Sequence, residues 1–215
     1  MIYNLILFLI LIGFWIAYNV HTFVSWTIPV WKEKQYFEAY ASFGMMTFIG
    51  IILLEIFYWA FTGFQTTLTN QITVYFSSFP ITSIFESIAF IAGWVFWILG
   101  LMFLVGSFWR LKKEGEPTDN WELTTKFVNK FPFSIVRHPM FCGASLFALS
   151  FFLFFLTYLS LILGIVAIVF LYLASMGEDK FDEEKFPEEY NKYIKQIPRW
   201  NFILGFIKQI KKRCS

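Results

Sequence analysis

Long apolar stretches separated by short polar segments make up most of this chain. A bilayer-spanning helix needs about 20 mostly apolar residues, and stretches of that kind lie near residues 2–24, 41–63 and 84–107. A fourth stretch, residues 140–176, has no charged side chain. As one straight helix it would be about 55 Å long, against a hydrocarbon core of about 30 Å. We therefore predict a turn near residues 157–160 that makes this stretch a helical hairpin.

An all-α membrane protein with about five transmembrane helices follows from this pattern, and the basic residues indicate its orientation. The connection at residues 65–83 contains no Lys or Arg. With five spans, every basic side chain falls on one side, which the positive-inside rule makes cytoplasmic. If residues 140–176 spanned once, the basic side chains would be split between both sides. We therefore expect the N-terminus outside and the C-terminus in the cytoplasm.

Composition supports a membrane protein and excludes several other classes. The chain of 215 residues is 58% hydrophobic and 15% charged, whereas soluble domains carry about 25% charged residues. The first apolar stretch has no basic segment or small-residue cleavage site, so we expect a retained helix. The net charge of +2 gives no reason to expect a nucleic-acid partner. Two distant cysteines and two histidines offer no metal-ligand spacing, and we predict no metal site.

One domain accounts for the whole chain, residues 1–215. Its predicted parts are three N-terminal helices in residues 1–107, a cytoplasmic loop at 108–139, the hairpin at 140–176 and a cytoplasmic tail at 177–215. Within the tail, Pro187 should end or kink a helix. Residues 201–213 mix apolar and basic side chains, which is typical of a segment lying on an anionic leaflet.

Polar residues flank the hairpin on both sides. Arg137 and His138 precede Pro139, a residue suited to the first turn of a helix, where free N–H groups favour an anion. The alternative is that Arg137 binds a lipid phosphate. After the hairpin, Glu178 and Asp179 would favour a cation at the membrane face, although a solvated helix carries such acids too.

Two further charged residues are candidates for chemistry. Arg199, beside Trp200, could hold an anion at the interface or reach a lipid phosphate. Glu55 lies near mid-membrane in the second apolar stretch, where a charge costs about 2.5–3.5 kcal/mol. Its role is therefore either functional or that of a hydrogen-bonding group within the helix bundle.

These flanking residues carry a resemblance to a known family. The sequences Arg137-His138-Pro139-Met140-Phe141 and Glu178-Asp179…Phe186…Tyr190…Tyr193…Pro198-Arg199 resemble the isoprenylcysteine carboxyl methyltransferases, integral membrane enzymes that use S-adenosylmethionine. The resemblance covers about residues 131–200. Departures from the family pattern are Phe141 for Tyr, Asp179 for Glu and Pro187 for Gly. The stretch at 131–143 also looks like the related phosphatidylethanolamine N-methyltransferases.

The resemblance implies S-adenosylmethionine as cofactor and names the residues that bind it. Arg137, His138 and the helix N-terminus would hold its carboxylate, Glu178 and Asp179 its cationic part, and aromatic side chains its adenine or sulfonium. The complete predicted cofactor site is Arg137, His138, Pro139, Met140, Phe141, Glu178, Asp179, Tyr190 and Tyr193. The catalytic candidates are Arg199, which would hold a carboxylate acceptor, and Glu178 and Glu55, either of which could be the base for an amine acceptor.

The leading function is O-methylation of an isoprenylcysteine carboxylate or a similar lipidic acid. Phospholipid N-methylation is the alternative, followed by a non-catalytic membrane protein or a lipid reductase of related architecture. The partners implied are a lipidic or prenylated substrate and membrane lipids. The implied location is the endoplasmic reticulum or a bacterial or archaeal plasma membrane, with the active site facing the cytoplasm.

Overall fold

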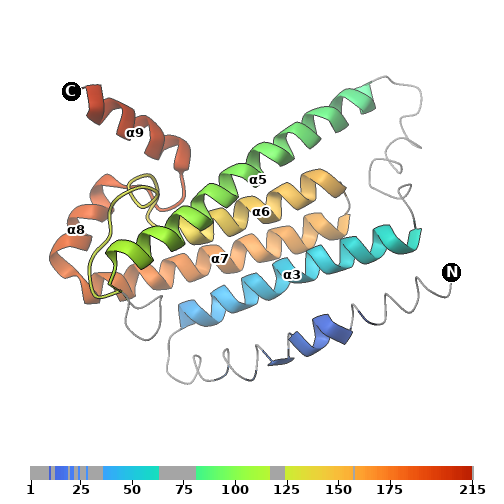
Figure 1. The fold of residues 1–215 in the computed structure, drawn as a ribbon, viewed down its shortest axis with the longest axis horizontal. Helices are drawn as coiled ribbons and strands as arrows, with labels where there is room; N and C mark the ends of the chain where they lie inside the picture. The colour runs from blue at the N-terminus through green and yellow to red at the C-terminus, as the bar shows by residue number, and fades with distance from the viewer. Residues whose placement is uncertain are drawn as a thin grey trace.

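The computed structural model describes residues 36–62, 81–116, 124–156 and 158–214, with a few positions between residues 10 and 28. These residues form helices and no strand, as predicted. Most of the first predicted span, residues 2–24, lies outside the described residues. Four helices lie side by side: α3 (Tyr36–Thr62), α5 (Ile81–Glu114), α6 (Pro139–Phe155) and α7 (Tyr158–Lys185) (Figure 1). The shorter α8 (Pro187–Gln196) and α9 (Phe202–Cys214) follow at one end.

Two of these helices are long and apolar enough to cross a membrane. The qualifying segments are Ile84–Glu114 in α5 and Ser160–Lys185 in α7, and Pro139–Phe155 is a shorter apolar helix. A membrane protein is therefore supported, whereas the number of five spans and the orientation stay predictions.

The predicted hairpin turn is present, just before the expected position. α6 ends at Phe155, and Leu156 takes the left-handed conformation, with φ 50° and ψ 41°. Its N–H donates to the carbonyl of Phe152 at 2.7 Å, and α7 begins at Tyr158. A left-handed residue directs the chain out of the helix, so the apolar run folds back on itself.

The second helix of the hairpin continues past residue 176, where we predicted the cytoplasmic tail to begin, and this boundary stays a prediction. α7 runs on through the acidic residues to Lys185 and stops only where Phe186 precedes Pro187, the first residue of α8. We predicted that Pro187 ends or kinks a helix, and this is confirmed. The physical reason is that a residue before proline disfavours helical geometry. Glu178 and Asp179 are therefore held on a rigid helix.

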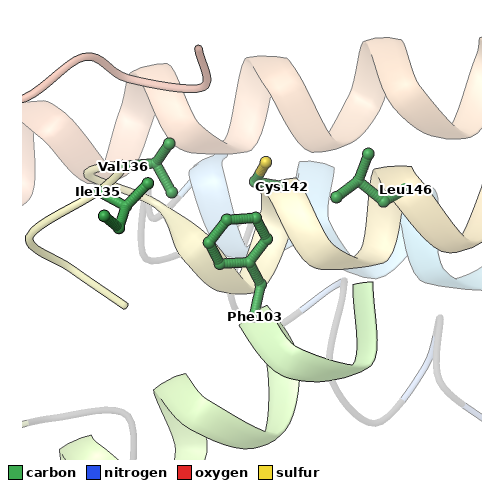
Figure 2. Close-up of a cluster of buried hydrophobic side chains, with 5 residues drawn as sticks. All are labelled: Phe103, Ile135, Val136, Cys142 and Leu146. Carbon is green, nitrogen blue, oxygen red and sulfur yellow. The ribbon is translucent and has the colours of Figure 1, made fainter. Parts of the chain in front are cut away.

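A compact core fixes the segment that enters α6. Phe103 of α5, Ile135 and Val136 before α6, and Cys142 and Leu146 within it form a buried cluster (Figure 2). The side chains of Phe202 and Phe206 from α9 pack against this cluster. These contacts place the chain directly before Arg137 between α5 and α9.

Candidate functional site

Backbone contacts bring the two halves of the site together. The N–H of Arg137 donates to the carbonyl of Pro198 at 3.0 Å, so Arg137 lies beside Arg199. His138 is the N-cap residue of α6 and Pro139 its first residue. Pro139 has no N–H to leave unpaired there, which is why the helix begins at this point.

Asp179 is the centre of the site. One of its oxygens, Oδ1, accepts from Arg137 Nη1 at 3.0 Å, His138 Nε2 at 2.6 Å and the Tyr190 hydroxyl at 2.6 Å. The other, Oδ2, accepts from Arg199 Nε at 2.7 Å and lies 2.6 Å from its Nη2. Asp179 is 7% exposed. A carboxylate bonded by that many donors organises the cationic side chains around it.

His138 connects Asp179 to Glu178. Its Nδ1 lies 2.5 Å from Glu178 Oε2, while its Nε2 faces Asp179. Burial disfavours the charged imidazolium, but the Glu178 charge and the bonds to both carboxylates outweigh it and raise the pKa of His138 from 6.5 to about 9. His138 is therefore a cation near neutral pH, and both its ring nitrogens donate.

Two buried tyrosines join the tail to the segment before α6. Tyr190 reaches Asp179, and the Tyr193 hydroxyl donates to the carbonyl of Phe133 at 2.6 Å. The Phe127 ring packs edge-on against both tyrosines, with ring centroids 6.1 and 5.1 Å away. Burial and the neighbouring carboxylates raise the pKa of each tyrosine, so both hydroxyls stay protonated.

Arg199 also contacts an aromatic side chain within α7. Its guanidinium carbon lies 5.6 Å from the centroid of the Tyr172 ring, and Nη1 donates to the Tyr172 hydroxyl at 3.3 Å. The ring of Trp200 packs edge-on against Tyr172 at 5.3 Å. Burial lowers the pKa of Arg199, but the bonds to Asp179 and Tyr172 and the charge of Asp179 together outweigh burial and raise the pKa, so the guanidinium remains charged.

Most of the residues predicted from the sequence meet in this cluster. Arg137, His138, Glu178, Asp179, Tyr190 and Arg199 are joined by hydrogen bonds or ion pairs. Met140 and Phe141 lie in the first turn of α6, where the Phe141 ring stacks on His138 with centroids 6.2 Å apart. Tyr193 is adjacent, 5.7 Å from Tyr190 between ring centroids. Glu55 lies on α3, but its side chain is outside the described residues.

Sequence reasoning missed Phe127 and Tyr172. Tyr172 is seven residues before Asp179, two helical turns that place both side chains near one face of α7. That spacing could have identified Tyr172 as a neighbour of the site from the sequence. Phe127 lies in an irregular segment, where no periodicity indicates what a side chain contacts.

The fold and the site together define a helical membrane protein with a buried charged cluster at the polar end of an apolar hairpin. Comparison with known families makes this specific: the model described as phospholipid methyltransferase matches residues 88–189. The predicted resemblance to this family of membrane methyltransferases is therefore confirmed over this segment, which is just under half of the chain. The match includes Arg137, His138, Glu178 and Asp179. Neither a curated protein nor a solved structure matched the chain.

Proposed function

We propose that this protein transfers a methyl group from S-adenosylmethionine to a lipid-bearing acceptor at the membrane face. The observation that supports this most is the convergence of Arg137, His138, Glu178 and Arg199 around the buried Asp179. The cluster joins the two sequence motifs from either side of the hairpin, within or next to the family match. The match also favours a methyltransferase over a lipid reductase.

The residues present fit the charged groups of the cofactor. Nε of Arg137 is buried and has no hydrogen-bond partner among the described residues, so it could donate to the cofactor carboxylate. The first turn of α6 has no side-chain cap, leaving the N–H groups of Met140 and Phe141 for the same anion. The cofactor, when bound, supplies an electrophilic methyl group on its sulfonium.

Glu178 suits the cationic part of the cofactor. Its side chain is 35% exposed, whereas that of Asp179 is 9% exposed. Asp179 is bonded on both oxygens, so in our proposal it holds Arg137, His138 and Arg199 in position. Tyr190 and Tyr193 would then lie behind these three cationic side chains as seen from the cofactor, and Phe141 would lie at the edge of the site.

For the acceptor, we propose O-methylation of an isoprenylcysteine carboxylate or a similar lipidic acid. A carboxylate needs a positive group to hold it and no base, and Arg199 is 26% exposed at the edge of the cluster. The family description favours phospholipid N-methylation as the second candidate. An amine acceptor would need a base, and Glu178 or Glu55 would take that role.

The two acceptors are distinguished by methyl transfer in membranes that contain the protein. Labelled S-adenosylmethionine is offered with farnesylcysteine analogues in one sample and with phosphatidylethanolamine in another. We expect base-labile label on the prenylcysteine, because a methyl ester is hydrolysed by alkali. Label confined to phospholipid would establish N-methylation instead. Label in neither, with no cofactor binding, would refute the methyltransferase assignment.

Binding of S-adenosylhomocysteine tests the cofactor site separately from the acceptor. We expect Arg137→Ala and Glu178→Ala each to weaken binding at least tenfold, because each removes a charged partner worth about 1.5–3 kcal/mol. The matched control is Glu188→Ala, an exposed acid on α8, which should bind like the parent protein. Unchanged binding in both site variants would place the cofactor elsewhere.

A further inference from the structure

The C-terminal helix α9 has two apolar faces, and the described part of the chain packs against one of them. On the covered face, Phe202 and Phe206 pack against the core cluster, and Gln209 donates to the carbonyl of Ser134 at 2.7 Å. A side-chain Cβ at Gly205 would lie 2.0 Å from the Ile135 carbonyl oxygen. Glycine therefore lets α9 sit directly on the backbone that leads into Arg137.

The opposite face of α9 is apolar and exposed among the described residues. Ile203, Leu204, Ile207 and Ile210 are 61, 41, 45 and 62% exposed. Exposed Lys208 borders this face, Lys211 lies on it one turn beyond Ile207, and Lys208 also donates to the carbonyl of Gln196 at 2.9 Å. An apolar face with one lysine at its edge and another at its C-terminal end is complementary to a leaflet with an apolar interior and an anionic surface.

The level of α9 along the bundle agrees with such a position. The ring of Phe202 packs against Phe103 of α5, with centroids 6.1 Å apart. Phe103 precedes Arg110, the first charged residue toward that end of α5, by seven residues, or about 10 Å of helix. Interfacial helices insert their apolar face by about 5–10 Å into the boundary between headgroups and acyl chains. With Arg110 at the membrane surface, the start of α9 would lie at the depth of that boundary.

α9 also extends beyond the side of the bundle. Its C-terminal half lies outside the outline of α3, α5, α6 and α7 (Figure 1). In a membrane crossed by those helices, a helix that extends sideways at the polar end lies over the surrounding lipid. We infer that α9 is an in-plane helix that binds anionic phospholipid, with its isoleucines among the acyl chains and Lys211 at the headgroup phosphates.

Fluorescence quenching in lipid nanodiscs tests this inference on the full chain. A Cys214→Ser background leaves only the buried Cys142, and an environment-sensitive label is placed at Ile207→Cys. Nanodiscs contain phosphatidylcholine, with or without phosphatidylglycerol, and an acyl-chain nitroxide quencher. We expect the label at 207 to be quenched several-fold more strongly when phosphatidylglycerol is present. A label at Glu188→Cys, on the polar helix α8, should show weak quenching in both.

Charge variants separate anionic attraction from simple apolar contact. Lys211→Glu should return quenching at 207 to its level in phosphatidylcholine alone, whereas Lys195→Glu, the same change on α8, should not. Equal quenching with and without phosphatidylglycerol would overturn the anionic preference. Absence of quenching in both lipids would overturn membrane docking. Self-quenching between labels that increases with protein density, without quenching by the lipid nitroxide, would show instead that the exposed face of α9 packs against a second copy of the chain.

Discussion

At the scale of single residues, the stability of the site depends on one carboxylate. Asp179 is the shared partner of Arg137, His138 and Arg199. The change Asp179→Asn would keep the shape of the side chain but leave the buried Arg137 and His138 and the partly exposed Arg199 without their shared counter-charge. We expect a loss of about 3–5 kcal/mol in the free energy of unfolding, measured by denaturant titration in detergent.

Glu188→Gln is the control for this change, because it removes a carboxylate from an exposed position on α8. Its effect should stay within about 0.5 kcal/mol. If Asp179→Asn were as stable as the parent, the cluster would not hold the fold together.

His138 should make stability depend on pH. Its pKa is raised from 6.5 to about 9 because the carboxylates of Glu178 and Asp179 outweigh the effect of burial. Such a group stabilises the fold fully below its unfolded pKa, and this contribution is lost as pH rises through its folded pKa. We expect the melting temperature to fall between pH 6.5 and about 9, and the fall to be smaller in His138→Gln. Parallel profiles for parent and variant would show that His138 is not the titrating group.

At the scale of helices, α5 and α6 approach so closely that their contact requires glycine. A Cβ at Gly143 would lie 2.8 Å from the carbonyl oxygen of Gly100 and 3.0 Å from Leu104. Small residues at such crossings allow membrane helices to pack backbone to backbone. We expect Gly143→Ala to cost about 1–3 kcal/mol, because the nearest neighbour is backbone and cannot rotate away.

Gly164 in α7 offers the matched comparison. A Cβ there meets only the Ala148 carbonyl oxygen, at 3.7 Å, an ordinary contact distance. Gly164→Ala should therefore be tolerated or raise the free energy of unfolding by up to about 1 kcal/mol. Equal effects of the two substitutions on denaturant unfolding would contradict the close crossing.

The helices also show what the sequence allowed us to predict. The apolar run of residues 140–176 is too long for one span, so a hairpin whose ends return to one face was predictable. The sequence did not allow us to predict which of the two acids, Glu178 or Asp179, faces inward, because that depends on how packing orients α7 about its axis. Asp179 continues the buried row of Leu171 and Ser175 at four-residue spacing, while Glu178 is half-buried. The stop at Pro187 was predictable from the proline, whereas the continuity of α7 from the apolar stretch into the acidic residues was not predicted.

At the scale of the whole molecule, several contacts gather the charged segments at one end of the bundle. Arg110 of α5 donates to the carbonyl of Phe131 at 3.1 Å, and Glu114 pairs with Lys130 at 3.2 Å. The Arg137–Asp179 pair then ties this segment to the far end of α7. The end of α5, the segment before α6 and the tail therefore share one end of the bundle. In a membrane crossed by α5 and α7, we expect them on one side, for a reason independent of the positive-inside rule.

Labelling with a membrane-impermeant maleimide tests this arrangement. Glu86 and Lys113 are separated by about 40 Å of helix in α5, more than the hydrocarbon core of about 30 Å. In a Cys214→Ser background, we expect Glu86→Cys to react in intact cells. Lys113→Cys and Lys195→Cys should react only after permeabilisation, because the tail is bonded to the same end as Lys113. Labelling of Glu86→Cys and Lys113→Cys from one side would show that α5 does not span. The reverse pattern, with Glu86→Cys alone protected, would keep the architecture but invert the orientation, placing the candidate site outside the cytoplasm.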